Sequence, residues 1–193
     1  EGVSSAKAAG QLMQKGILLR YAEQPFETGG QKFGRGSIIV LKTSNKHAAA
    51  NLWKTVADVC NENNITAYPA ASGFVDKGFD FGSDKIRPMK APKVAMVTGE
   101  GIGSNAAGEI WHFFERQLDY PLTLINANDL ARARWSDIDV LIMPDGNYRF
   151  LNDKAQLDEF KNWINKGGRV VALEGAVAQL AKAEMGIKLK KPE

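Results

Sequence analysis

The sequence predicts an α/β protein, with a doubly wound parallel sheet in its second half and a smaller α/β subdomain before it. The first observation is a set of short, nearly continuous apolar runs, which are typical of strands buried on both faces of a parallel sheet. The second is that helical patterns separate these runs, since alternating strands and helices imply right-handed crossovers. The runs cover residues 94–97, 122–125, 140–143 and 170–173.

Helices are expected after the first and third of these runs, and a last one after Gly175. Asn152 or Asp153 is expected to cap the second helix, and Gly167 to end it. Apolar residues recur at helical spacing in each, so each helix turns one face inward. These residues are Ile110, Phe114 and Leu118, then Leu157, Phe160 and Ile164, then Val177, Leu180 and Ala181.

The first half predicts a less regular α/β arrangement. Pro25 and the pair Gly29 and Gly30 mark turns between its first two strands. The expected strands cover residues 17–22, 37–41 and 65–68. The expected helices cover residues 4–15, ending at Gly16, and residues 48–61, with Leu52, Val56 and Val59 on one face.

A long irregular stretch separates the two halves. Residues 69–92 are rich in Gly, Pro and Asp, and a structureless segment of that length is uncommon inside a compact domain. The stretch is expected to be a linker or a loop that wraps the domain surface. With the boundary near Lys90, the sequence predicts an N-terminal α/β subdomain over residues 1–90 and a second domain over residues 91–193.

Composition excludes several function classes. The 193 residues are 44% apolar and 24% charged, as in ordinary soluble domains, and no apolar run is long enough to span a bilayer. The net charge is only +3 and the basic residues are scattered, which argues against a nucleic-acid partner. Cys60 is the only cysteine, so the chain forms no internal disulfide. Because the chain begins at Glu1, it is expected to be a processed or excised piece whose signal peptide, if any, lies outside it.

A glycine-rich turn follows the first apolar run of the second half. Gly99, Gly101 and Gly103 lie between that run and a helix expected to begin at Ser104 or Asn105. This strand–turn–helix pattern is used to hold anions or to build a crevice. The dinucleotide-binding pattern is incomplete, because Ser104 stands where its last glycine should be. A tight turn that needs glycine for positive φ is therefore expected rather than a nucleotide site.

Four stretches carry a resemblance to a known family. They are PFETGGQKFGRGSIIV, GFDFGSDKI, KVAMVTGEGIGSNAAGEIWHFFE and DIDVLIMPDGNY, in this order from about Pro25 onward. On them the chain resembles the C-terminal region of large bacterial secreted proteins of the carboxypeptidase A-like zinc peptidase family. The second half resembles the class I glutamine amidotransferase-like fold, which has a flavodoxin-like sheet.

This resemblance implies an accessory domain. The peptidase chemistry of such proteins lies in a preceding domain that this chain lacks, so zinc is expected only there and no cofactor is expected in this fragment. The parent protein would be a zinc metallocarboxypeptidase, a bacterial hydrolase that is secreted or periplasmic. The implied partner is the preceding peptidase domain of the same chain, with a small polar ligand as a further possibility.

The resemblance also locates the nucleophile that an amidotransferase would need. Such an enzyme places a cysteine on the sharp turn between strand and helix, activated by a histidine. By register with the family, Leu173 occupies that position in GRVVALEGAVAQLA, followed by Glu174 and Gly175, and no histidine follows. Cys60 lies in the other half and is expected to be a packed core thiol. The chain is therefore expected to be a pseudoenzyme with respect to glutamine.

A short metal motif is present but incomplete. His112 and Glu115 spell HxxE, the signature of carboxypeptidase zinc ligands, and a spacing of three brings them together on a helix. A catalytic zinc needs three protein ligands. The family's third ligand is a downstream histidine, whereas the only other histidine is His47, upstream. No metal site is expected.

A flavodoxin-like strand order would reverse between the strands at Val94 and Val140, so that residues 98–104 and 144–150 flank one crevice. That crevice is the expected site for a ligand of mixed polarity or for a loop of the peptidase domain. Its candidate residues are Glu100, Gly101, Gly103, Ser104, Asp145, Asn147, Tyr148, Arg149 and Glu174. The alternative is that Asp145 and Gly146 form only a turn and that Tyr148 and Arg149 are surface residues.

Two classes of function remain open from the sequence. The first is a non-catalytic accessory domain that binds a ligand or a partner within a larger zinc carboxypeptidase-like protein. The second is a hydrolase of unrecognised type that uses acidic crevice residues, for instance Glu100 with Glu174 as an acid/base pair.

Overall fold

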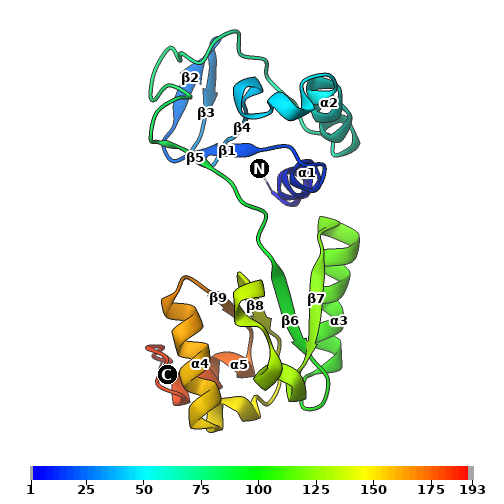
Figure 1. Cartoon of the computed structure of the whole chain (residues 1–193), viewed down its shortest axis with the longest axis vertical. Helices are drawn as coiled ribbons and strands as arrows, with labels where there is room; N and C mark the ends of the chain where they lie inside the picture. Colours follow the sequence, from blue (N-terminus) through cyan, green and yellow to red (C-terminus); the bar gives the residue numbers. More distant parts are fainter. Residues whose placement is uncertain (1, 191–193) are drawn as a thin grey trace. The chain divides into compact units, whose positions relative to one another are not determined.

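The computed structural model describes residues 2–190 (Figure 1). The chain forms two compact units. The first unit comprises Glu1–Ala91 with Leu118–Tyr120, and the second comprises Pro92–Gln117 with Pro121–Glu193. Both units are α/β, and within residues 2–190 no helix has the length and apolar character to cross a bilayer.

The second unit contains a four-stranded sheet in which every strand is parallel to its neighbours. The strands are β6 (Val94–Thr98), β7 (Leu122–Asn126), β8 (Val140–Met143) and β9 (Arg169–Ala172), in the spatial order β7-β6-β8-β9 (Figure 1). All four apolar runs of the second half are therefore strands. The first residue of β6 pairs with the first residues of both its neighbours, so the carboxyl ends of these strands lie side by side.

Helices follow β6, β8 and β9, as the sequence predicts. They are α3 (Ser104–His112), which continues into the π-helix η3 (Phe113–Leu118), α4 (Lys154–Asn165) and, after the last strand, α5 (Gly175–Lys182). Two 3-10 turns, η4 (Ala127–Arg132) and η5 (Trp135–Asp137), lie between β7 and β8, and a third, η6 (Arg149–Asn152), lies between β8 and α4. Of the two expected caps of α4, Asp153 is the one that acts, since its carboxylate accepts from the Gln156 N–H at 3.0 Å.

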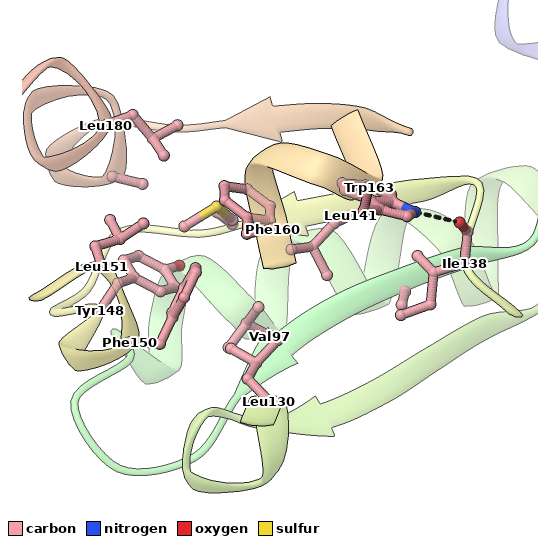
Figure 2. Packing of buried hydrophobic residues seen from close by; sticks show 13 residues of the cluster. Val97, Leu130, Ile138, Leu141, Tyr148, Phe150, Leu151, Phe160, Trp163 and Leu180 are labelled. Atoms are coloured by element: carbon pink, nitrogen blue, oxygen red, sulfur yellow. Dashed lines mark hydrogen bonds between the residues drawn. The ribbon is translucent and has the colours of Figure 1, made fainter. Parts of the chain in front are cut away.

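One hydrophobic cluster of thirteen buried residues forms the core of the second unit (Figure 2). Phe160 of α4 is fully buried, stacks on Trp163 and meets Phe150 edge to face. The indole N–H of Trp163 donates to the Ile138 carbonyl at 2.8 Å, so the one polar atom of that ring is satisfied inside the core.

The expectation of strands buried on both faces holds only for the middle of this sheet. Val94 to Val97 of β6 are all buried. The outer strands β7 and β9 expose Leu124 and Val171, which are 49% and 45% accessible. The physical reason is the strand order, because an edge strand has a neighbour on only one side and the layers above it end there. Periodicity in the sequence does not reveal which strands lie at the edges.

The first unit contains a small antiparallel sheet with the order β4-β1-β5. Its strands are β1 (Leu19–Ala22), β4 (Ile38–Val40) and β5 (Ile86–Pro88), and a separate hairpin joins β2 (Phe26–Thr28) to β3 (Gln31–Phe33). Gly29 and Gly30 make the turn of that hairpin with φ of 56° and 74°, values that glycine adopts without strain. Its helices are α1 (Val3–Gln14) and α2 (Leu52–Glu62), with the 3-10 turns η1 (Lys42–Ser44) and η2 (Lys46–Ala48) between β4 and α2.

The expected strand over residues 65–68 is wrong, since these residues take no part in a sheet. Of the two expectations for residues 69–92, a loop that wraps the domain fits better than a linker, because the stretch as far as Ala91 belongs to the first unit, contains β5 and places Phe81 in a buried cluster with Phe26. Helix α2 also begins later than expected, at Leu52, since residues 46–48 form the turn η2. The expected apolar face of α2 is confirmed: Leu52, Val56 and Val59 are all buried.

Candidate functional site

Three connections meet at the carboxyl ends of the parallel strands. They follow β6, β8 and β9, and they contain the candidate residues named from the sequence. We call them the edge loops: residues 98–104, 144–150 and 173–175. The strand order places β6 between β7 and β8, so the chain direction across the sheet reverses between β6 and β8. Such a point is where ligands bind in open α/β sheets.

The first two edge loops are joined to each other by backbone hydrogen bonds. The Gly103 N–H donates to the Asp145 carbonyl at 2.8 Å, and the Asn147 N–H donates to the Gly101 carbonyl at 2.8 Å. Ile102 and Gly146 form an antiparallel bridge between these two bonds. The residues expected to face each other across a crevice therefore form a short ladder.

Glycine is required where the two loops approach each other. A Cβ on Gly146 would lie 2.8 Å from the Gly101 oxygen and 2.9 Å from the Ile102 Cα, closer than non-bonded atoms allow. Gly101 itself has a φ of 84°, which non-glycine residues adopt only with strain. Gly103 ends the loop and is the N-cap residue of α3, and Ser104 is the exposed first residue of that helix.

A charged pair also crosses between the two loops. Glu100 and Arg149 approach to 3.8 Å, and both side chains are largely exposed, at 70% and 77%. An exposed pair of this kind contributes at most about 1 kcal/mol. Arg149 is thus already beside a carboxylate of its own unit. Asn147 is exposed next to it.

Tyr148 is a core residue and not part of a polar pocket, which corrects both interpretations of it from the sequence. Its side chain is 1% exposed and lies in the buried cluster (Figure 2). Its hydroxyl donates to the Pro144 carbonyl at 2.6 Å. Burial, and to a lesser extent the charge of Asp145, raises the pKa of the Tyr148 phenol well above its usual value. The buried aromatic ring anchors the loop after β8 to the core.

Gln179 also holds this loop, through hydrogen bonds to its backbone, and the sequence analysis does not identify it. Its side-chain oxygen accepts from the Tyr148 N–H at 2.8 Å. Its amide nitrogen donates to the carbonyl of Gly146 and, at 3.3 Å, to that of Gly175. The signal in the sequence was a single amide beside Leu180 and Ala181 on the apolar side of the last helix. A half-buried amide in that place needs hydrogen-bond partners, and the loop backbone supplies them.

The third edge loop is a sharp turn from β9 into α5. Glu174 sits at the turn with φ 49° and ψ −120°, a conformation that costs a non-glycine residue about 1–3 kcal/mol. Elbow nucleophiles occupy such strained strand-to-helix turns. The strained position is held by Glu174, and not by Leu173, the residue that the resemblance places at the nucleophile position. Leu173 is 39% exposed, one residue before it.

The side chain of Asp145 is hydrogen-bonded to the backbone N–H that follows the elbow. Its carboxylate accepts from the Gly175 N–H at 3.0 Å. In hydrolases with a nucleophile elbow, the N–H after the nucleophile is a donor of the oxyanion hole. In this chain a side chain of the same unit already accepts that hydrogen bond. The half-buried Asp145 thus joins the second edge loop to the third.

The remaining chemical candidates lie apart from the edge loops. Cys60 is buried on α2 in the first unit, and this burial raises the pKa of its thiol. His112 is the last residue of α3, whereas Glu115 falls in the π-helix that follows, where i,i+3 spacing no longer has α-helical geometry. Among residues 2–190, no three His, Cys, Asp or Glu side chains are grouped so that they could hold a metal ion.

Comparisons with models of protein families, with curated proteins and with solved structures found no match.

Proposed function

We propose that this chain is a non-catalytic accessory domain of a larger zinc carboxypeptidase-like protein. In this proposal the second unit has a flavodoxin-like, class I glutamine amidotransferase-like fold that has lost its nucleophile. One observation carries the proposal: the strained elbow position holds Glu174, and Asp145 occupies the N–H that would serve an oxyanion. The strand order supports it, because β7-β6-β8-β9 corresponds to the order 2-1-3-4 with which a flavodoxin-like sheet begins.

The edge loops form a rigid surface. Two backbone hydrogen bonds, the amide of Gln179 and the carboxylate of Asp145 hold them together. Beside the partly exposed Leu173, they expose polar side chains and charges of both signs: Glu100, Asn147, Arg149 and Glu174. A rigid polar surface suits the recognition of a protein loop, because little ordering entropy is lost on binding. We propose that its partner is the preceding peptidase domain, in a secreted or periplasmic protein, and that zinc is held only by that domain.

The partner surface is tested by chemical-shift mapping of the chain against a zinc carboxypeptidase domain encoded immediately upstream of it. We expect the shifts to gather at the edge loops and the affinity to fall about five-fold for Arg149→Ala, since one charged contact is lost. Arg132→Ala is the matched control, because Arg132 is equally exposed and also forms a long ion pair, with Asp129. Shifts confined to the first unit, or equal effects of the two variants, would contradict the proposal.

The lack of amidotransferase chemistry is tested by following ammonia release from glutamine. We expect none above the uncatalysed rate, because a carboxylate at position 174 is a weak nucleophile toward an amide. Steady release that disappears in Cys60→Ser would show that the buried thiol acts after all. Elemental analysis of protein purified without chelators is expected to show no stoichiometric zinc. About one zinc per chain, lost in His112→Ala, would show that the HxxE motif is a metal site after all.

A second function is favoured by the strain at Glu174. Strained residues gather at active sites, and this one presents an exposed carboxylate at the edge where ligands of α/β sheets bind. The chain would then be a hydrolase of unrecognised type, with Glu174 and Glu100 as its acid and base. Turnover of a panel of chromogenic esters and glycosides that is lost in both Glu174→Gln and Glu100→Gln would favour the hydrolase over the accessory domain. We expect no turnover.

A further inference from the structure

Strand β9 forms an open edge of the parallel sheet (Figure 1). Within residues 2–190 it pairs only with β8, on one side. The N–H groups of Arg169 and Leu173 donate, at 3.0 Å each, to carbonyls in or just before β8. Alternate residues of a parallel strand bond to the same neighbour, so the N–H and C=O groups of Val170 and Ala172 point away from β8. The open edge thus offers donors and acceptors to a further strand.

One face of this edge is apolar and exposed. Val170 and Ala172 pack against the core cluster of the second unit, so Val171 and Leu173, at the alternating positions, lie on the opposite face. Their side chains are 45% and 39% exposed. A strand added at this edge would therefore pair with free backbone groups and also remove apolar surface from water.

The chain itself returns to this edge after α5. The eight residues of α5 run back about 12 Å, close to the length of about 13 Å of the four residues of β9, and so lead to the amino end of that strand. Helices α4 and α5 both contribute to the core cluster on one face of the sheet. A right-handed crossover from β8 through α4 advances to β9, and a second one through α5 on the same face advances past β9. Residues 183–186 are enough for the turn.

The segment that follows has the sequence pattern of a strand. Residues 187–190, which we call the tail, read Ile-Lys-Leu-Lys. This alternation of apolar and basic side chains is typical of a strand with one apolar face. In the structure the tail belongs to no strand or helix, and Ile187 and Leu189 are 37% and 53% exposed. The tail therefore has the pattern of a strand and the length of β9, but it is not paired as a strand among the described residues.

We propose that the tail closes the open edge of β9 as a fifth parallel strand. When its four residues are aligned with the four of β9, Leu189 lies beside Val171, and both side chains lose exposed apolar surface. Lys188 and Lys190 then lie on the other face at the margin of the sheet, where their stems pack and their ammonium groups reach water. The structure shows the open state. In the closed state the tail ends beside the start of the third edge loop, next to Leu173.

Amide hydrogen exchange of the intact chain, followed by NMR, tests this closure residue by residue. We expect the Val170 and Ala172 amides to exchange about ten-fold more slowly than unstructured amides, as they do when the closed state is about ten times as populated as the open one. The Val171 and Leu173 amides are the internal control, because they point toward β8 and stay protected whenever β9 is folded. Exchange of Val170 and Ala172 at the unprotected rate overturns the proposal. Protection that rises with protein concentration also overturns it, because a second chain would then cover the edge.

Two variants of the tail separate its apolar contact from its charge. Leu189→Asp places a carboxylate beside Val171 and is expected to return the Val170 and Ala172 amides to the unprotected rate, while the two control amides stay protected. Lys188→Gln removes a neighbouring charge but keeps the apolar face, and is expected to leave the protection unchanged. The proposal fails if Leu189→Asp has no effect or if both variants lose protection equally. Because no peptidase domain is present in this experiment, its outcome does not depend on the accessory role of the chain.

Discussion

The hydrophobic cores of the two units are organised differently. The second unit has a single cluster of thirteen buried residues, to which strands, helices and 3-10 turns all contribute (Figure 2). The first unit has two separate clusters, one of nine residues around α1 and α2 and one of five around Phe26 and Phe81. In the second cluster of the first unit, Phe81 comes from a stretch without regular secondary structure.

The comparison shows that one core follows from the apolar periodicity of the sequence, whereas the other depends on contacts that a loop makes. A parallel sheet is filled by continuous apolar runs, so its core can be read from periodicity. One surface of the smaller antiparallel sheet is covered by the β2–β3 hairpin and by a loop that contributes Phe81. That loop is held by backbone bonds to one hairpin residue, since Glu27 exchanges hydrogen bonds with Asp76 and Lys77. A core of that kind leaves no periodic signal.

The largest expected effect comes from emptying the continuous core. Phe160→Ala removes a fully buried ring that contacts three other aromatic residues, and it should lower the free energy of unfolding of the second unit by about 3–5 kcal/mol. Urea denaturation combined with hydrogen exchange of the β6 and β8 amides measures this loss.

Phe81→Ala is the matched variant in the divided core. Because it belongs to a cluster of only five buried residues, its loss should be smaller and should appear in the amides of β1 and β5. Equal losses of protection in both units for either variant would mean that the two cores unfold as one, and the comparison would fail.

The next effect tests whether the edge loops are closed. Gly146→Ala introduces a Cβ against the backbone of the opposite loop and should destabilise the second unit by about 1–3 kcal/mol. Gly108→Ala is the control, because a Cβ there meets open space on α3 and should stabilise the helix by about 0.5–1 kcal/mol. If Gly146→Ala were neutral in thermal unfolding, the two loops would not be joined in solution.

A pH dependence distinguishes the buried Tyr148 from a surface tyrosine. Its pKa in the folded chain is raised above the ordinary value of about 10, so the folded state keeps the proton that the unfolded state loses. The contribution to stability is complete below pH 10 and declines above it, by up to about 1.4 kcal/mol per pH unit. Tyr148→Phe should be less stable at pH 7, having lost the bond to Pro144, but should show a flatter decline in urea denaturation between pH 10 and 11. Parallel declines would contradict this.

The smallest effect concerns the strained elbow. Glu174→Gly should raise the free energy of unfolding by about 1 kcal/mol, because glycine adopts φ 49° and ψ −120° without a Cβ clash. Glu174→Ala keeps the Cβ and should give no gain, which separates backbone strain from the loss of charge. If alanine raised the free energy of unfolding as much as glycine, the gain would come from removing the carboxylate and not from relieving backbone strain. Thermal unfolding of the three proteins at one pH measures it.

The meeting of the edge loops was predictable, but their construction was not. The glycines of residues 98–104 and the turn at Asp145 and Gly146 indicated that the loops after β6 and β8 lie together, and the structure joins them. Tyr148 was misjudged because a polar-tipped ring in a loop gives no sign that it turns into the core. Gln179 was missed because its partners are backbone groups of a loop more than thirty residues away along the chain.

The sequence by itself determined the α/β class, the four strands of the parallel sheet, the helices between them and the inner face of α2. Each follows from apolar periodicity, which is a local property of the chain. Only the tertiary structure decided which strands became edges, that β5 would arise within an irregular stretch, and that two edge loops would pair through their backbones. These outcomes depend on hydrogen bonds between segments distant in the chain, and such bonds join backbone groups that every residue carries. Apolar periodicity therefore holds no record of them.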